Sequence, residues 1–155
     1  MQRRKFFTFF CGAAVAWPLR ARAQQPKIPV VGFLNGGSPD GYAPYLTGFL
    51  HGLNETGYVE GKNVTVDYQW AKGQYDHLQV MAADLVRRKV AVIAANTPTA
   101  PVAKASTTEI PIVFVNTGDP VMAGLVTSFN RPGGNVTGVS LLGPELETKR
   151  LELLN

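Results

Sequence analysis

The chain has 155 residues, 45% of them hydrophobic, which is enough for one domain with a buried core. Its formal charge of +4 looks basic, but residues 1–23 hold five of the fifteen cations and no acid, so the remainder carries ten basic and eleven acidic residues. That balance excludes a basic nucleic-acid-binding surface, and the single cysteine, Cys11, lies in the same first segment, which excludes disulfides and thiol metal sites from the rest.

Residues 1–23 have the features of an export signal. They begin with Arg3 and Arg4, continue with an apolar run over residues 6–17, and end in an A-x-A cleavage box at residues 21–23. The paired arginines resemble a twin-arginine signal. The run of about 12 residues is too short to span a bilayer, which needs roughly 20. We therefore expect cleavage near Ala23, a periplasmic protein, and no stable membrane insertion afterwards.

From residue 30 onward, predicted strands alternate with predicted helices. Apolar runs predict strands over residues 30–34, 90–95, 111–115 and 136–140, and an alternating pattern predicts a half-exposed edge strand over residues 64–68. Apolar residues at helical spacing predict helices over residues 42–53, 78–86, 121–129 and 145–154, and a short Ala-rich helix opens at residues 96–99 and ends near residue 106.

This alternation predicts the α/β class, with a doubly wound parallel sheet. The edge-like second strand fits the strand order 2-1-3-4-5, which places the topological switch point between the first and third strands. Open α/β sheets bind their ligands at such a point, beyond the carboxyl ends of the strands.

Three of the predicted strands are each followed by a helix cap and a proline: Ser38-Pro39, Thr97-Pro98 and Asp119-Pro120. Ser, Thr and Asp accept free N–H groups of a helix's first turn, and proline suits the first helical position. Three helix N-termini at one crevice favour a small anion such as a carboxylate. The acidic cap, Asp119, is instead suited to an ammonium group. Each pair taken alone is also explained by helix stability.

Enzyme signatures are missing from the sequence. It contains no G-x-G-x-x-G, P-loop or G-x-S-x-G pattern, and no spacing of metal ligands. His51 and His77 fall within helices as surface or boundary residues. We therefore expect neither a catalytic centre nor a cofactor.

Three stretches resemble the TrpX-type family of ABC-transporter substrate-binding proteins: residues 57–64 (GYVEGKNV), 119–126 (DPVMAGLV) and 131–139 (RPGGNVTGV). The similarity extends over the whole chain after the signal. It implies a type I periplasmic-binding fold, in which two α/β lobes close on a small ligand, often an aromatic amino acid or a relative of one. Residues 24–140 match the first lobe, residues 141–155 match the crossover into the second lobe and its first helix, and the rest of that lobe is missing.

Carried onto matching positions, the resemblance places ligand contacts in the loops after the first, third and fourth strands. Together with the polar residues that directly follow two of these strands, the candidate contacts are Asn35, Ser38, Asn96, Thr97, Thr99, Thr117, Gly118 and Asp119.

These observations favour a non-catalytic receptor that binds a small ligand in the interlobe cleft and delivers it to an ABC permease. Two alternatives stay open. One is an exported α/β enzyme whose catalytic residues lie in the missing half, and the other is a ligand-sensing module of a regulatory system.

Overall fold

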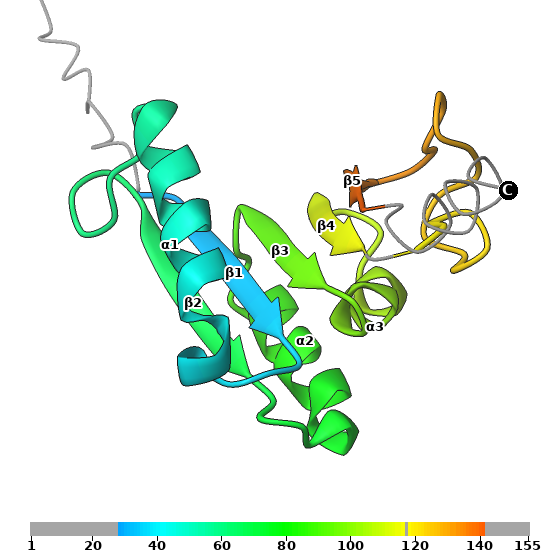
Figure 1. The fold of residues 1–155 in the computed structure, drawn as a ribbon, viewed down its shortest axis with the longest axis horizontal. Coiled ribbons are helices and arrows are strands. Elements are labelled where there is room, and N and C mark those ends of the chain that lie inside the picture. Colours follow the sequence, from blue (N-terminus) through cyan, green and yellow to red (C-terminus); the bar gives the residue numbers. More distant parts are fainter. Residues whose placement is uncertain (1–27, 117, 142–155) are drawn as a thin grey trace, which may run out of the picture.

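A five-stranded parallel sheet organises the protein, seen here in a computed structural model that describes residues 28–116 and 118–141 (Figure 1). The strand order is β2-β1-β3-β4-β5 and every neighbouring pair is parallel. This confirms the predicted α/β fold, with its switch point between β1 and β3. The elements in chain order are β1 (Val30–Asn35), α1 (Pro39–Glu55), β2 (Thr65–Trp70), the 3₁₀ turn η1 (Tyr75–His77), α2 (Leu78–Arg87), β3 (Val92–Asn96), α3 (Thr99–Ser106), β4 (Ile112–Asn116) and β5 (Val136–Ser140).

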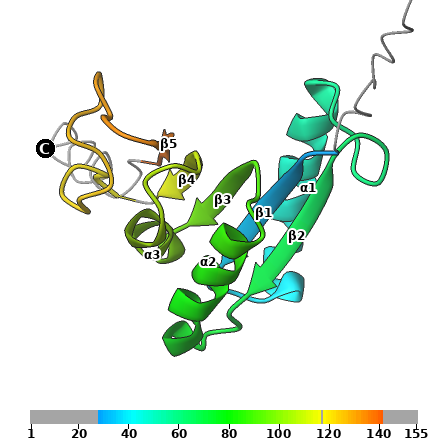
Figure 2. The same ribbon diagram turned by 180° about the vertical axis from the view of Figure 1, so that it is seen from behind.

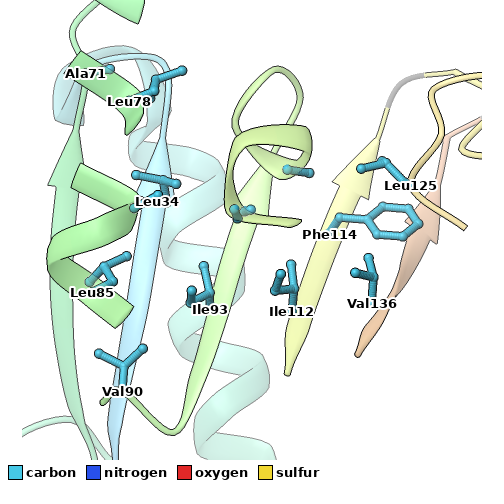
Figure 3. Packing of buried hydrophobic residues seen from close by; sticks show 14 of the residues in the cluster. Leu34, Ala71, Leu78, Leu85, Val90, Ile93, Ile112, Phe114, Leu125 and Val136 are labelled. Carbon is cyan, nitrogen blue, oxygen red and sulfur yellow. The ribbon is translucent and has the colours of Figure 1, made fainter. Parts of the chain in front are cut away.

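The helices divide between the two faces of the sheet. Helix α1 lies over β1 and β2 in the view of Figure 1, whereas α2 and α3 lie on the reverse face, seen in Figure 2. The reverse face holds the larger core, in which side chains from successive strands form a row beneath α2 and α3 (Figure 3). That row consists of Leu34, Ile93, Ile112, Phe114 and Val136, with Leu85 of α2 packed against it.

The α1 face is packed less completely. Its core cluster contains Val31, Phe33, Val64 and Val66, against which α1 packs several partly buried side chains. No residue of α1 is itself buried. Further along the same face, Val113 and Val115 of β4 are exposed. A parallel sheet normally has both faces covered by helices. On the α1 face this covering is incomplete.

The predicted helix over residues 121–129 is wrong. After Asp119 the backbone completes a single turn and then reverses at Gly124, whose φ is +66°. The N–H of Gly124 donates to the carbonyl of Val121 at 2.9 Å and that of Leu125 to the carbonyl of Pro120 at 2.8 Å, which is the Schellman pattern of a helix end. The helical spacing was misleading because start and stop signals stand only five positions apart.

The cap–proline prediction also fails at Thr97. Helix α3 begins at Thr99, with Pro98 in the N-cap position and a cis peptide bond between Thr97 and Pro98. Thr97 therefore precedes the helix and does not cap it. The other elements predicted within the described residues are confirmed with bounds close to those expected, and Gly57 follows α1 with a φ of +87°, as a C′ residue should.

Three expectations fall on parts of the chain that the structure does not describe. They are the export signal over residues 1–23, the ligand contact at Thr117, and the crossover and helix after residue 141. Within the described ranges, no helix is both long enough and apolar enough to cross a membrane.

Candidate functional site

The candidate site lies where the parallel strands end together. Strands β1 and β3 are neighbours, and both end on asparagine, at Asn35 and Asn96. Their carboxyl ends are followed by the loops that lead into α1 and α3. The structure thus brings the polar residues of two predicted loops to one edge, at the switch point.

Asn35 and Asn96 hold the first loop by their side-chain amides. The Oδ1 atom of Asn35 accepts the N–H of Gly37 at 2.8 Å and faces the Nδ2 of Asn96 at 3.4 Å. The Oδ1 of Asn96 accepts the N–H of Gly36 at 3.2 Å. Asn35 is fully buried, while Asn96 is half-buried. The two amides therefore fix the backbone of the loop that a ligand would approach.

Thr99 joins the two strands from beneath this loop. Its hydroxyl oxygen accepts the N–H of Asn96 at 3.1 Å and lies 2.8 Å from the carbonyl oxygen of Leu34, to which it can donate. The side chain is fully buried. These protein partners occupy the hydroxyl, so the residue orients Asn96 and ties β3 to β1.

A third loop, which the sequence reasoning did not include, completes this edge. The segment after β2 donates three backbone hydrogen bonds to the first loop: Ala71 to Asn35, Lys72 to Gly37 and Gly73 to Gly36, at 2.8 to 2.9 Å. These three hydrogen bonds join the loop after β1 to the loop after β2. The signal in the sequence was the polar, glycine-containing stretch between the second strand and the second helix.

Tyr75, at the start of η1, comes close to the same loop. A Cβ atom at Gly36 would lie 3.1 Å from Cε1 of Tyr75 and 3.2 Å from Cδ of Pro98, so only glycine lets the loop pass between them without displacement. Tyr75 is 56% exposed. Its ring is therefore a second feature of the edge that the sequence reasoning missed.

Ser38 stands at the N-cap of α1, as predicted, with extended backbone angles and Pro39 as the first helical residue. Its hydroxyl makes no capping hydrogen bond, which leaves the first-turn N–H groups of α1 without a side-chain acceptor. Thr97 is exposed at the same edge, and its N–H donates to the carbonyl of Val115 at 3.2 Å.

Asp119 lies half-buried beyond β4, at the far side of the edge. Its Oδ1 accepts the N–H of Val121 at 2.7 Å and the N–H of Met122 at 3.2 Å. The predicted capping role is confirmed for this single turn. The carbonyl of Gly118 accepts a hydrogen bond from the hydroxyl of Ser140 at the end of β5.

This arrangement offers amide, hydroxyl and carboxylate groups on a rigid edge, which suits hydrogen bonding to a small polar ligand. Among the described residues, no group of three or more His, Cys, Asp or Glu side chains could hold a metal ion. His51 lies on the surface of α1, its Nδ1 3.7 Å from Glu55, away from the edge where α1 begins.

Comparison with known proteins identifies relatives with this fold. A tyrosine-binding protein of Clostridioides difficile (strain R20291) is 40% identical over 94 residues, which is 60% of this chain and 27% of that protein. The chain thus spans about a quarter of the length of this curated relative.

Three solved structures are also similar to this chain in both sequence and fold. A ligand-free, open substrate-binding protein with adhesive properties from Clostridium difficile is 30% identical with a TM-score of 0.72, and a conserved domain protein from Vibrio cholerae is 35% identical with a TM-score of 0.73. Each match covers 81% of this chain and 43% of the other. An ABC domain from Streptococcus pneumoniae in complex with L-Trp is 30% identical with a TM-score of 0.68, over 74% and 39% of the two chains.

The family model for ABC transporter substrate binding proteins matches residues 27–155, which is most of the chain and includes every strand of the sheet. The resemblance seen in the sequence is therefore confirmed, and the chain belongs to the ABC transporter substrate-binding protein family.

Proposed function

We propose that this chain is the first lobe of an exported, non-catalytic solute receptor. It binds an amino acid, with tyrosine and tryptophan as the leading candidates, in a cleft between this lobe and a second one. The loaded receptor then delivers the amino acid to an ABC permease in the inner membrane. The export signal expected in residues 1–23 would bring the protein to the periplasm.

The observation that carries this proposal is the braced edge at the switch point. Asn35 and Asn96 hold the first loop in place, and Thr99 fixes Asn96 in turn. A site fixed before the ligand arrives loses little entropy on binding, which favours affinity without any chemical step. The tyrosine-binding and L-Trp-bound relatives suggest which ligand such an edge receives.

The candidate residues divide into two roles. Asn35 and Thr99 are buried and position their neighbours, whereas Asn96, Thr97 and Ser38 are accessible enough to meet the ligand. The N-terminus of α1, without a capping hydroxyl bond, suits the ligand carboxylate.

At the far side of the same edge, beyond β4, Asp119 suits the ligand's ammonium group. We assign Thr117 and Gly118, which precede it, to the same wall. An amino acid would thus be held by its two charged ends between α1 and the turn after β4.

Calorimetric titration of the full-length protein with L-tyrosine, L-tryptophan and L-leucine tests the proposal. We expect saturable binding of the aromatic amino acids, with the ligand recovered unchanged by chromatography. Failure to bind any amino acid contradicts the receptor, and a converted product would establish the enzyme alternative instead.

Thr97→Val tests the site in the same titration. Loss of one ligand hydrogen bond should weaken binding about tenfold, the equivalent of roughly 1.4 kcal/mol. Thr47→Val is the matched control, because the Thr47 hydroxyl bonds within α1 to the carbonyl of Ala43 at 3.0 Å and lies away from the edge. Equal affinities for the two variants would remove Thr97 from the site.

A further inference from the structure

The polar groups of the proposed ligand site leave the side chain of an aromatic amino acid without a partner. Ser38, Asn96, Thr97 and Asp119 offer hydrogen bonds or charge to the carboxylate and ammonium groups, which every amino acid carries. A preference for aromatic ligands needs apolar or aromatic surface in addition, because ligand pockets are lined mostly by such side chains. The described part of this edge contains an exposed ring in a suitable place, at Tyr75.

Tyr75 lies against the loop that Asn35 and Asn96 hold in place. A Cβ atom at Gly36 would lie 3.1 Å from Cε1 of Tyr75 and 3.2 Å from Cδ of Pro98, so both side chains are next to this glycine. The N–H of Gly36 donates to Oδ1 of Asn96. Tyr75 and Pro98 therefore form an apolar pair at the switch point, close to a residue that is accessible to the ligand.

The backbone that carries Tyr75 is fixed by hydrogen bonds to this edge. The loop after β2 donates three of them to the loop after β1, the last from Gly73 to Gly36 at 2.9 Å. The N–H of Gln74 then donates to the carbonyl of Ala71 at 2.8 Å, and η1 begins at Tyr75. Because its backbone is tied to the loop that it contacts, the residue has little backbone freedom to lose when a ligand binds.

The side chain of Tyr75 is accessible. It is 56% exposed, and Pro98 is exposed as well. Within residues 28–116 and 118–141, the ring joins no aromatic pair and the hydroxyl makes no hydrogen bond. Tyr68 and Trp70, the aromatic residues of β2, instead pack on Phe33 with ring centroids 5.8 and 5.3 Å from it. Tyr75 thus keeps an open aromatic surface at the ligand edge, whereas these rings are used in the packing of the α1 face.

We propose that Tyr75 is a specificity-determining residue of the ligand site, and that its ring packs against the aromatic side chain of the bound amino acid. This rests on the proposed function. Aromatic rings attract each other in offset-stacked or edge-to-face arrangements, at roughly 4.5–7 Å between centroids, beyond the effect of buried area. An aliphatic side chain in the same place gains the burial without the ring interaction. Tyr75 therefore favours tyrosine, tryptophan and phenylalanine over leucine.

Calorimetric titration of the full-length protein with L-tyrosine, L-tryptophan, L-phenylalanine and L-leucine tests this. The measured quantity is the ratio of the leucine Kd to the Kd of each aromatic amino acid. Tyr75→Leu removes the ring and keeps an apolar side chain, and Tyr75→Phe keeps the ring. Tyr58→Leu is the matched control, because Tyr58 is 47% exposed but lies between α1 and β2, at the edge of the sheet where the strands begin.

We expect Tyr75→Leu to lower this ratio about threefold to tenfold, through weaker binding of the aromatic ligands, which is the size of one aromatic pair. Tyr75→Phe and Tyr58→Leu should keep the wild-type ratio. An unchanged ratio in Tyr75→Leu overturns the proposal. An equal loss of affinity for leucine and the aromatic ligands also overturns it, because Tyr75 would then support the loop or the closed state and not the choice of ligand.

Circular dichroism checks the folding of each variant, and Tyr75→Gln, which also lacks the ring, takes the place of Tyr75→Leu if that variant does not fold. The wild-type titration separates this proposal from the receptor function. If the wild type binds no amino acid, both are wrong. If it binds leucine as tightly as the aromatic ligands, or if Tyr75→Leu keeps the wild-type preference, the receptor stands and only the role of Tyr75 is overturned.

Discussion

The two faces of the sheet are built from similar residues but are buried very differently. Along β4, Ile112 and Phe114 point to the α2–α3 face and are 0% and 2% exposed, whereas Val113 and Val115, which alternate with them, are 42% and 47% exposed. The strand is apolar on both sides, as in parallel sheets that are covered twice. The difference shows that an apolar strand sequence predicts that both faces of the strand will be buried, but does not identify the segment that buries them.

The order of the strand connections explains why one face of the sheet is covered more completely than the other. The chain moves from β1 to β2 in one direction across the sheet, and then from β2 through β3 to β4 in the other. Right-handed crossovers therefore place α1 on one face and both α2 and α3 on the opposite one. Helix α1 lies over β1 and β2, so β3 is only partly covered on its side and Val113 and Val115 of β4 are exposed.

The largest expected difference between the faces is in core truncation. Ile93→Ala removes a fully buried side chain beneath α2 and α3 and should lower the free energy of unfolding by about 2–5 kcal/mol. Val113→Ala on the α1 face should cost less than about 0.5 kcal/mol in the 155-residue chain. Urea denaturation followed by circular dichroism measures both, and similar losses would contradict the comparison.

A substitution at Thr99 tests how much the hydrogen bonds between β1 and β3 contribute to stability. Thr99→Val keeps the shape of the side chain but removes the hydroxyl between Asn96 and Leu34, and should cost about 1–3 kcal/mol. Thr99→Ser keeps the hydroxyl and should cost less. If serine is as damaging as valine in urea denaturation, packing of the methyl group is what matters.

Two substitutions at Asp119 distinguish its contribution to stability from its contribution to ligand binding. Asp119→Ala should cost about 1 kcal/mol, because Val121 and Met122 lose their capping acceptor. Asp119→Asn retains an acceptor and should be nearly neutral for stability while lowering affinity for the ligand's ammonium group. If Asp119→Asn leaves the calorimetric affinity of the full-length protein unchanged, Asp119 is only a cap.

The smallest effect belongs to Tyr68 on the α1 face, whose ionisation changes stability only at alkaline pH. Burial, followed by the hydrogen bond to Glu60 and the charge of its carboxylate, raises the pKa of Tyr68 from its usual 10.0 to about 12. Because the folded pKa lies above the unfolded one, the stabilisation is complete below about pH 10 and is lost as the pH rises toward about 12.

Titration of tyrosine absorbance in the near ultraviolet checks this. Tyr68→Phe should remove one late-titrating group. Glu60→Gln should lower the pKa of Tyr68 only in part, because burial is the larger cause. A full return to the usual pKa in Glu60→Gln would show that the carboxylate dominates.

Residue patterns predicted the sheet order, because a single alternating strand among apolar ones could only be the edge, and the structure confirms that order. They also predicted Asn35 and Asn96 as polar groups at strand ends, since parallel strands end at one edge. These inferences need only local periodicity and chain direction. They did not predict that Thr99 would be buried, with its hydroxyl bonded to two strands.

The failures have local causes that spacing does not show. In residues 121–129, Gly124 adopts a left-handed conformation and ends the turn despite helically spaced apolar residues. At Thr97 the helix begins one residue later than the cap–proline pair predicted. In both places the sequence contains more than one signal for where a helix starts or stops, and apolar spacing alone does not show which of them the backbone follows.

The sequence alone determined the class of fold, the direction of its strands and the edge at which the candidate site lies, because these follow from hydrophobic period and parallel pairing. Only the tertiary structure decided which strand residues are covered. Burial depends on where a crossover places its helix, and that is a property of the whole sheet. Val113 and Ile112 are both apolar neighbours on one strand, yet one is half-exposed beside a groove and the other is fully buried.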